Sequence, residues 1–184
     1  MKRGFDVVLS LLALLALSPV LAAAAAAVAV ESGFPVLFRQ QRVGLGGRSF
    51  AMLKFRSMVK DAAATGPYFT SDNDPRVTRV GRFLRRSSID ELPQLWNVLR
   101  GDMSLVGPRP DLPVQEGLYS PADWALRCSV RPGLTGLAQA TLRSQATPEQ
   151  RLAADLDYAR RPGLWLDLRI IARTFGRLTG QGSN

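Results

Sequence analysis

The sequence predicts a mainly helical α+β protein: an N-terminal re-entrant membrane helix, a small β-hairpin, and amphipathic interfacial helices around one larger domain. Three observations predict this. An uncharged apolar run opens the chain, two short extended segments flank a glycine-rich turn, and helical apolar spacing dominates the remainder. A length of 184 residues suits a single domain. We therefore divide the chain into a membrane segment, residues 1–30, and a domain formed by residues 31–184.

The opening segment is long enough to enter a membrane. No residue between Val7 and Val30 is charged, and as a helix this run would be roughly 36 Å long, enough to cross a hydrocarbon core. A cleaved signal peptide is an alternative, because Lys2 and Arg3 precede an apolar stretch that ends in an alanine-rich region. The run is longer than the apolar core of a typical signal peptide.

A break in the middle of this run favours a helix that enters the bilayer and returns. Ser18-Pro19 lies at its centre, where proline removes a backbone hydrogen bond and bends the helix. Basic residues lie on both sides of the run, which favours a cytoplasmic position for both ends: Lys2, Arg3, Arg39, Arg42 and Arg48. A kinked helix that spans the membrane is the alternative.

A β-hairpin is predicted next. The segments 35–43 and 49–58 are rich in Val, Phe and Leu, and residues 44–47 between them read Gly-Leu-Gly-Gly. Such a turn signal between two extended segments is typical of a hairpin. Residues 62–75 contain Gly-Pro and Asn-Asp-Pro and are predicted to form a surface loop.

Helices are predicted for most of the rest. Arginines recur at helical spacing between residues 76 and 86, a second helix starts near Ser88 and stops at Gly101, and a third covers residues 148–160 with Thr147 as its N-cap. The last predicted helix, residues 164–178, places Trp165, Leu168, Ile171, Ala172 and Phe175 on one face and Arg169, Arg173 and Arg177 on another. A helix that lies on an anionic membrane has this pattern, and so does an ordinary amphipathic helix.

Composition limits the chemistry. The net charge of +9 points to anionic partners: nucleic acid, acidic lipid or phosphorylated substrates. Because the chain has no histidine, Ser-His-Asp and Cys-His catalysis and His-ligated zinc are excluded. Its one cysteine, Cys128, permits no intramolecular disulfide. Any catalysis therefore depends on carboxylates, Lys, Arg, hydroxyls, backbone groups or a hard cation such as Mg²⁺.

The pair Asp90-Glu91 is the first candidate for catalysis. Arg85 and Arg86 precede it, and it opens a predicted helix. A carboxylate beside arginine at a helix start stays ionised, while the same charges attract phosphate. This arrangement suits attack of a carboxylate on phosphorus. The alternative is structural, since Ser88 to Glu91 has the sequence of a capping box.

Two further segments supply cations. Lys54 and Arg56 share one side of the second predicted strand and could together hold a diphosphate. Arg109 lies between two prolines, Pro108 and Pro110, which limit its backbone freedom and fix where its guanidinium lies. Each segment alone also fits an ordinary solvated strand or a proline-rich turn.

Taken together and in order, these segments resemble the bacterial sugar transferase family, the monotopic polyprenyl-phosphate phosphoglycosyltransferases. The similarity extends from residue 2 to the final helix. The segments that carry it are Lys2 to Asp6, Ser18-Pro19, Phe38 to Gly44, Lys54 to Met58, Asp90 to Leu95, Gly107 to Pro110, and Arg131 to Gly136.

The resemblance implies an enzyme of the bacterial inner (cytoplasmic) membrane, with a re-entrant helix broken at Ser-Pro and a catalytic domain on the cytoplasmic face. It would transfer a sugar-1-phosphate from a UDP-sugar to polyprenyl (undecaprenyl) phosphate and release UMP, in the first membrane step of glycoconjugate or polysaccharide assembly. Its partners would be these two substrates and membrane lipid, not nucleic acid. The sugar, the glycan pathway and the oligomeric state stay open, a homodimer included.

The resemblance also implies roles for single residues. Asp90 and Glu91 would form the catalytic pair of a ping-pong reaction, in which Asp90 carries the phosphosugar covalently and ligates Mg²⁺, the expected cofactor. Phosphate-binding cations would be Lys54, Arg85, Arg109 and Arg143. Phosphoryl transfer depends mainly on charge neutralisation and alignment, so the lack of histidine is consistent with this assignment.

One segment departs from the family pattern. Where the family usually has Gln-Val-Asn-Gly-Arg-Asn, residues 139–144 read Gln-Ala-Thr-Leu-Arg-Ser, and Leu137 replaces the usual Trp. Loop shape and sugar contacts at Ala140 to Ser144 are therefore open. Two rival functions also remain: a basic membrane protein without enzymatic activity that binds anionic lipid or nucleic acid, and an ordinary glycosyltransferase, which would release UDP instead of UMP.

Overall fold

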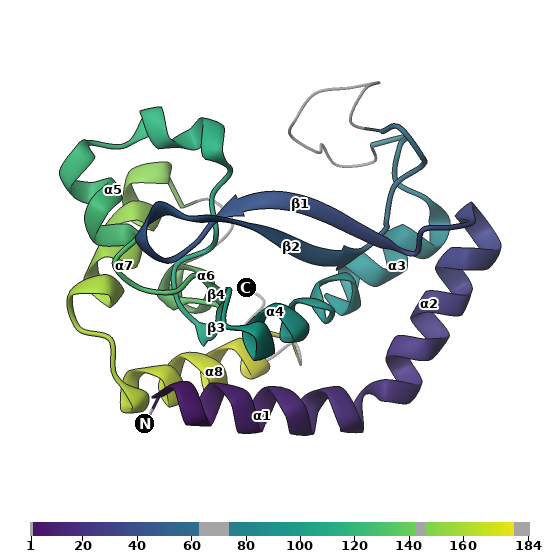
Figure 1. The fold of residues 1–184 in the computed structure, drawn as a ribbon, viewed down its shortest axis with the longest axis horizontal. Helices are drawn as coiled ribbons and strands as arrows, with labels where there is room; N and C mark the ends of the chain where they lie inside the picture. Colours follow the sequence, from purple (N-terminus) through teal and green to yellow (C-terminus); the bar gives the residue numbers. More distant parts are fainter. Residues whose placement is uncertain (1, 63–73, 143–145, 179–184) are drawn as a thin grey trace.

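The N-terminal segment folds as two helices that meet at a bend. A computed structural model describes residues 2–62, 74–142 and 146–178. Helix α1 (Lys2–Ala16) runs along one edge of the protein, and α2 (Ser18–Ser32) turns away from it by 63° (Figure 1). Pro19 lies in the first turn of α2, where a missing N–H breaks no intrahelical hydrogen bond. The predicted break at Ser18-Pro19 is confirmed.

Length and apolar composition separate this pair from the other helices. No single helix among the described residues is long and apolar enough to cross a bilayer, whereas α1 and α2 together meet both conditions.

The predicted hairpin is confirmed. Strands β1 (Leu37–Val43) and β2 (Ser49–Phe55) are antiparallel, with Gln40 opposite Met52 and Phe38 opposite Lys54. The connection contains a 3₁₀ turn (Leu45–Gly47) in which Gly46 has a φ of 64°. Glycine adopts this left-handed conformation without the cost that other residues incur.

A second sheet was not predicted. Strand β3 (Ser104–Val106) pairs in parallel with β4 (Gly133–Thr135). The two backbones lie so close that a Cβ added to Gly133 would be 2.1 Å from the amide nitrogen of Gly107. Glycine at this position therefore allows the segment 107–110, which carries Arg109, to pack directly against the segment that starts at Gly133.

Helices surround these strands: α3 (Arg79–Arg86), α4 (Gln94–Arg100), α5 (Pro121–Arg127), α6 (Leu137–Thr141), α7 (Pro148–Arg160) and α8 (Leu164–Leu178), with 3₁₀ turns at Ile89–Glu91 and Pro113–Leu118. The last two helices have the predicted bounds. Thr147 caps α7 by accepting a hydrogen bond from the Gln150 amide, and Gly101 ends α4 with a φ of 95°.

Helix α1 is packed onto the rest of the protein. Phe5, Ala13 and Leu14 contact the main hydrophobic cluster. The buried Asp6 carboxylate accepts hydrogen bonds from the Ser104 hydroxyl (2.9 Å) and the Leu105 amide (3.2 Å). Segment 1–30 and the remainder therefore share one core, although the predicted division at residue 30 follows the change in composition.

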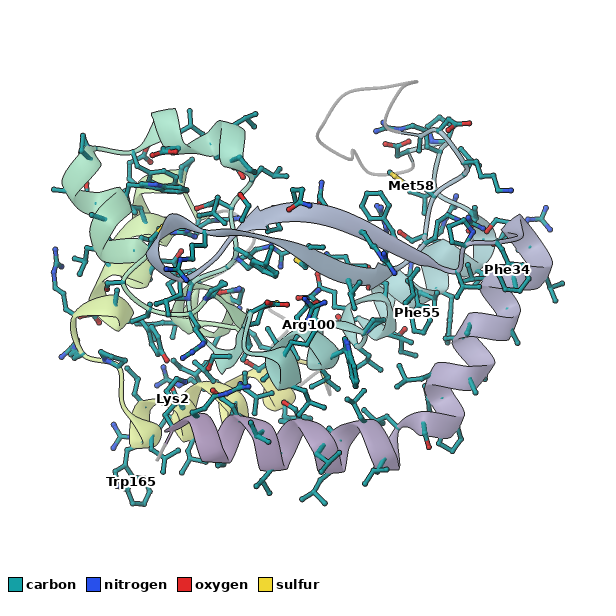
Figure 2. The ribbon with its side chains drawn as sticks, in the orientation of Figure 1. Lys2, Phe34, Phe55, Met58, Arg100 and Trp165 are labelled. Atoms are coloured by element: carbon teal, nitrogen blue, oxygen red, sulfur yellow. The ribbon has the colours of Figure 1, made fainter. Side chains whose placement is uncertain are left out.

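Most of the predicted apolar face of α8 is exposed, although Ile171 packs against the main hydrophobic cluster. Trp165 is 79% exposed and Phe175 64% exposed, whereas Asp167 and Ile170 on the opposite side are buried. Figure 2 shows Trp165 directed outward near the start of α1. Exposed leucines of α1 (Leu11, Leu12 and Leu15) add to this apolar surface. An ordinary amphipathic helix would bury its apolar face, whereas α8 leaves Trp165, Leu168 and Phe175 exposed.

Candidate active site

Asp90 and Glu91 lie in a tight turn before α4, not inside a helix. Ser88 has a φ of 57°, the 3₁₀ turn Ile89–Glu91 follows, and α4 begins only at Gln94. The Ser88 side chain makes no capping hydrogen bond. The capping-box alternative is therefore wrong, and so is the prediction of a continuous helix from Ser88.

Instead, Glu91 binds two of the predicted cations. The Lys54 ammonium, at the end of β2, donates to Glu91 Oε1 at 2.7 Å, and Arg109 Nη2 donates to the same oxygen at 3.2 Å. These three residues come from the three segments that the sequence marked as candidates. Their convergence on one carboxylate oxygen places the candidate residues in one site.

Asp90 is buried beside this group, 7% exposed. Burial raises the pKa of its carboxyl group, and the neighbouring Glu91 charge raises it further, while the charges of Lys54, Arg85 and Arg109 act in the opposite direction. None of the described residues donates a hydrogen bond to the Asp90 carboxylate. Its oxygens therefore lie near cations, and no donor from residues 2–62, 74–142 or 146–178 binds them.

Glu91 responds in the opposite way. Burial alone would raise the pKa of Glu91, but Arg109 and Lys54, by charge and by hydrogen bonds, hold it below its usual value. The two adjacent carboxyl groups thus differ because one has direct cationic partners and the other does not. Glu91 binds Lys54 and Arg109 directly, whereas no described residue donates a hydrogen bond to Asp90.

A shallow hollow, open to solvent, lies over Glu91. Charged, polar and apolar residues line it: Arg42, Met52, Lys54, Glu91, Gln94, Arg109, Pro110, Gly133 and Leu134. Three positive side chains in one hollow fit a ligand with several phosphate charges.

Arg42 is a site residue that the sequence reasoning missed. It lines the hollow from β1, and its guanidinium donates to the Pro110 carbonyl (3.0 Å) and to Gln40 Oε1 (2.6 Å). The hairpin register contains the signal that could have found it. Arg42 and Lys54 both lie at directly paired positions, opposite Phe50 and Phe38, and even-numbered residues of both strands share one face.

The other predicted cations have different positions. Arg85 donates from Nε to the Ser57 hydroxyl (2.8 Å) and is close enough to lower the pKa of Asp90. Arg56 follows β2 instead of extending it, and its buried guanidinium donates to the carbonyls of Ser32 and Gly33 at the end of α2. Arg56 and Lys54 therefore do not point to one site. Arg143 lies outside the described residues.

Of the two carboxylates in the site, Asp90 suits Mg²⁺ and Glu91 does not. The described residues contain no group of three Asp, Glu, His or Cys side chains that could hold a metal ion. Mg²⁺ needs no such cage, because it is commonly held by one or two carboxylates, with water and substrate phosphate completing its shell. The unoccupied oxygens of Asp90 fit that role, whereas Oε1 of Glu91 already has two cationic partners.

Adjacent carboxylates near Lys and Arg side chains suit phosphoryl transfer, which depends on positioning and charge neutralisation. Comparison with known sequences narrows this class of reaction. The chain belongs to the bacterial sugar transferase family, whose sequence pattern matches residues 1–181. The resemblance inferred from the motifs is confirmed.

Relatives align with nearly the whole of this chain. A protein of Caulobacter vibrioides named UDP-glucose:undecaprenyl-phosphate glucose-1-phosphate transferase is 49% identical over 180 residues, which are 94% of this chain and 67% of that protein. A protein of the same name from Xanthomonas campestris pv. campestris is 48% identical over 184 residues, 96% of this chain and 38% of its own length.

A third relative is named for another sugar. It is a UDP-N-acetylgalactosamine-undecaprenyl-phosphate N-acetylgalactosaminephosphotransferase of Aeromonas hydrophila, 41% identical over 191 residues, 99% of this chain and 44% of the relative. The chain thus spans between about a third and two thirds of these relatives. Because these names differ in the sugar, the likeness indicates no particular donor sugar.

Proposed function

We propose that this chain transfers a sugar-1-phosphate from a UDP-sugar to undecaprenyl phosphate and releases UMP. The observation that carries the proposal is the position of Asp90: buried, free of hydrogen bonds from the described residues, and surrounded by Lys54, Arg85 and Arg109. The names of the relatives supply the substrate class.

The reaction would proceed in two displacements. In the first, an Asp90 carboxylate oxygen attacks the β-phosphorus of the UDP-sugar, the bond between that phosphorus and the bridging oxygen breaks, and UMP leaves with the electron pair. In the second, a phosphate oxygen of undecaprenyl phosphate attacks the same phosphorus and the Asp90 carboxylate leaves. The product is a polyprenyl-diphosphate-linked sugar. Two displacements through one carboxylate constitute a ping-pong mechanism.

The cations around Asp90 would neutralise the diphosphate. Lys54 and Arg109 line the hollow beside Glu91, and Arg42 faces it from β1. Since both cations bound to Glu91 are held by that carboxylate, they are preorganised before substrate arrives. Glu91 is in this account the residue that orients the cations and forms no covalent bond.

Asp90 would hold Mg²⁺, and the ion would supply neutralisation of diphosphate charge.

The apolar elements support a membrane location for this site. Exposed apolar residues of α1 and α8 would contact lipid, and the bent pair α1–α2 would enter the bilayer and return, which leaves the catalytic domain on the cytoplasmic face. A lipid-linked acceptor requires such a position, because its phosphate remains at the membrane surface.

The released nucleotide tests this proposal. Purified protein in detergent or nanodiscs is incubated with a UDP-sugar, undecaprenyl phosphate and Mg²⁺, and the nucleotide products are separated by chromatography. UMP is the expected product. UDP would show that the sugar–phosphate bond breaks instead and would identify an ordinary glycosyltransferase. Salt-sensitive nucleic-acid binding without nucleotide turnover would favour the non-enzymatic alternative.

A further inference from the structure

The segment that carries Arg109 is held by hydrogen bonds at three successive backbone carbonyls. The Arg109 carbonyl accepts from Arg127 Nη2 at 2.7 Å, the Pro110 carbonyl from Arg42 Nη1 at 3.0 Å, and the Asp111 carbonyl from the Val43 amide at 2.9 Å. These donors come from α5 and from β1. The path of the backbone through Arg109 is therefore fixed from two sides.

Arg127 is the buried member of this set. It is the last residue of α5, is 8% exposed, and forms ion pairs with Asp111 and with Asp155 of α7, the latter at 2.8 Å. Its guanidinium also lies over the Tyr119 ring, 5.5 Å from the centroid. Arg127 thus joins α5, α7 and the Arg109 segment through one planar group.

Stabilisation of the fold does not by itself explain why Arg127 is buried with two carboxylates. Desolvation of a buried Arg with two carboxylates offsets most of the Coulomb attraction, and a well-packed apolar group of similar volume is often as stable. What a guanidinium adds is geometry, because its donors have fixed directions and can bind a carbonyl and two carboxylates at once.

The Arg109 side chain depends on that geometry. It is 55% exposed, and its one described side-chain partner is Glu91. A long side chain with one contact reaches that partner only if its backbone lies within range of it, so the position of the backbone decides whether the Arg109–Glu91 contact forms. The two flanking prolines restrict φ, but they do not set where the segment lies relative to Glu91.

We propose that Arg127 is a positioning residue: through the Arg109 carbonyl it places the Arg109 guanidinium at Glu91, where that cation meets the diphosphate. The inference rests on the proposed function for its substrate. It assigns to the Arg127–Asp111–Asp155 cluster a role in binding without direct contact with the ligand.

A double-mutant cycle separates positioning from a general structural role. The probe is UDP, whose binding to the full-length protein in detergent with Mg²⁺ is measured by calorimetry for wild type, Arg127→Lys, Arg109→Gln and the double variant. Arg127→Lys keeps the positive charge but loses the planar guanidinium with its several N–H donors in fixed directions. It is expected to weaken UDP binding about tenfold in the wild-type background and less than about twofold in the Arg109→Gln background. Equal losses in both backgrounds would overturn the proposal.

Arg3→Lys is the matched control. Arg3 also donates to two carbonyls, those of Val98 and Leu99, but these lie at the C-terminal end of α4, away from Glu91. We expect unchanged UDP affinity in this variant. If Arg127→Lys lacks a cooperative unfolding transition, Asp155→Asn, which removes one charge from the cluster and keeps Arg127, replaces it in the same cycle with the same expected non-additivity.

Amide hydrogen exchange distinguishes failure of this inference from failure of the proposed function. Arg127→Lys should raise exchange at the Val43 and Gly133 amides, which donate to the Asp111 and Pro108 carbonyls on either side of Arg109, and Arg3→Lys should not, whether or not the protein turns over a UDP-sugar. Unchanged exchange there would contradict positioning. If wild type binds no UDP, the proposed function fails, and the exchange result alone decides on Arg127.

Discussion

At the scale of single residues, two adjacent carboxylates have different environments. Glu91 accepts hydrogen bonds from Lys54 and Arg109, which hold its pKa below the usual value despite burial. Asp90 is buried without such donors among the described residues, so burial and the Glu91 charge raise its pKa. Neighbouring groups whose pKa values shift in opposite directions are typical of sites that assign them different tasks. The ionised fraction of Asp90 should therefore limit the rate on the acidic side.

This leads to a pH prediction for Arg109→Gln. In the proposed mechanism Asp90 attacks only as a carboxylate, and Arg109 is one of the cations that favour its ionised form. Loss of that charge raises the pKa of Asp90 further, so the acidic limb of the kcat/KM profile should move to higher pH. At the optimum, kcat/KM should fall by about a hundredfold, as when one preorganised donor is lost.

The profile is measured by UMP release over a range of pH. Arg161→Gln serves as control, because Arg161 forms an exposed pair with Asp157 at the end of α7 and should leave the limb in place. An acidic limb that stays fixed in Arg109→Gln would mean that another group controls it.

At the scale of elements, both ends of the bent helix pair are attached to the catalytic domain. Lys2 binds Asp167 of α8 (2.5 Å) at the start of α1, and Arg56 binds the carbonyls of Ser32 and Gly33 at the end of α2. Figure 2 shows Lys2 at one end of this pair and Phe34 just beyond the other. A helix pair attached at both ends keeps its bend relative to the site, which a lipid-linked acceptor would require.

Arg56→Gln tests the attachment of α2. Because hydrogen bonds from a charged donor are lost in a buried place, the free energy of unfolding should fall by about 2 kcal/mol, while KM for the UDP-sugar changes little. Chemical denaturation in detergent and steady-state kinetics measure the two quantities. A raised KM with unchanged unfolding would show instead that Arg56 binds substrate phosphate, as the sequence suggested.

Cysteine labelling tests the re-entrant topology. In a Cys128→Ser background, single cysteines are placed at Gly4, where a Cβ would meet nothing within 4 Å, and at the exposed Arg39. An impermeant thiol reagent applied to intact cells should label neither position, and both should react after permeabilisation. Labelling of position 4 alone would establish a helix that spans the membrane.

Pro19→Leu examines the cause of the bend in the same assay. Without proline in the first turn of α2, the free-energy cost of a straight helix falls. A fraction of the molecules should therefore expose position 4. The shift is expected to be partial, because the charges of Lys2 and Arg3 oppose crossing. Loss of an N-terminal peptide near Ala29 would instead identify a signal peptide.

At the scale of the whole molecule, local sequence signals predicted the features that depend on interactions between residues close in sequence. Proline after serine predicted the bend, glycines predicted the hairpin turn, and the capping residue Thr147 predicted the start of α7. Strands β3 and β4 have three residues each, too few for a periodic pattern, and they pair only because Gly107 and Gly133 allow close approach. That contact joins residues distant in sequence and cannot be predicted from local pattern.

In the candidate site, too, the sequence predicted individual residues but not their tertiary contacts. Its acidic pair and the cations Lys54 and Arg109 could be predicted from the sequence, partly by family resemblance, but their mutual contacts could not. The capping-box motif at Ser88 was misleading because Glu91 finds stronger partners in Lys54 and Arg109 than a backbone amide. Arg42 and Arg127 act through tertiary contacts, which strand register and buried pairing reveal only in the folded protein.

The proposed mechanism requires a phosphosugar bound covalently to Asp90, and intact-protein mass spectrometry detects such an adduct most directly. Wild type and Asp90→Asn, purified in detergent, are incubated with a UDP-sugar and Mg²⁺ in the absence of undecaprenyl phosphate. Because Asn matches the carboxylate in shape and Asp90 accepts no hydrogen bond from the described residues, the variant should stay folded. We predict that wild type gains the mass of one phosphosugar and releases one equivalent of UMP, and that the variant does neither. UMP release that begins only after undecaprenyl phosphate is added, with no adduct on wild type, would contradict the mechanism.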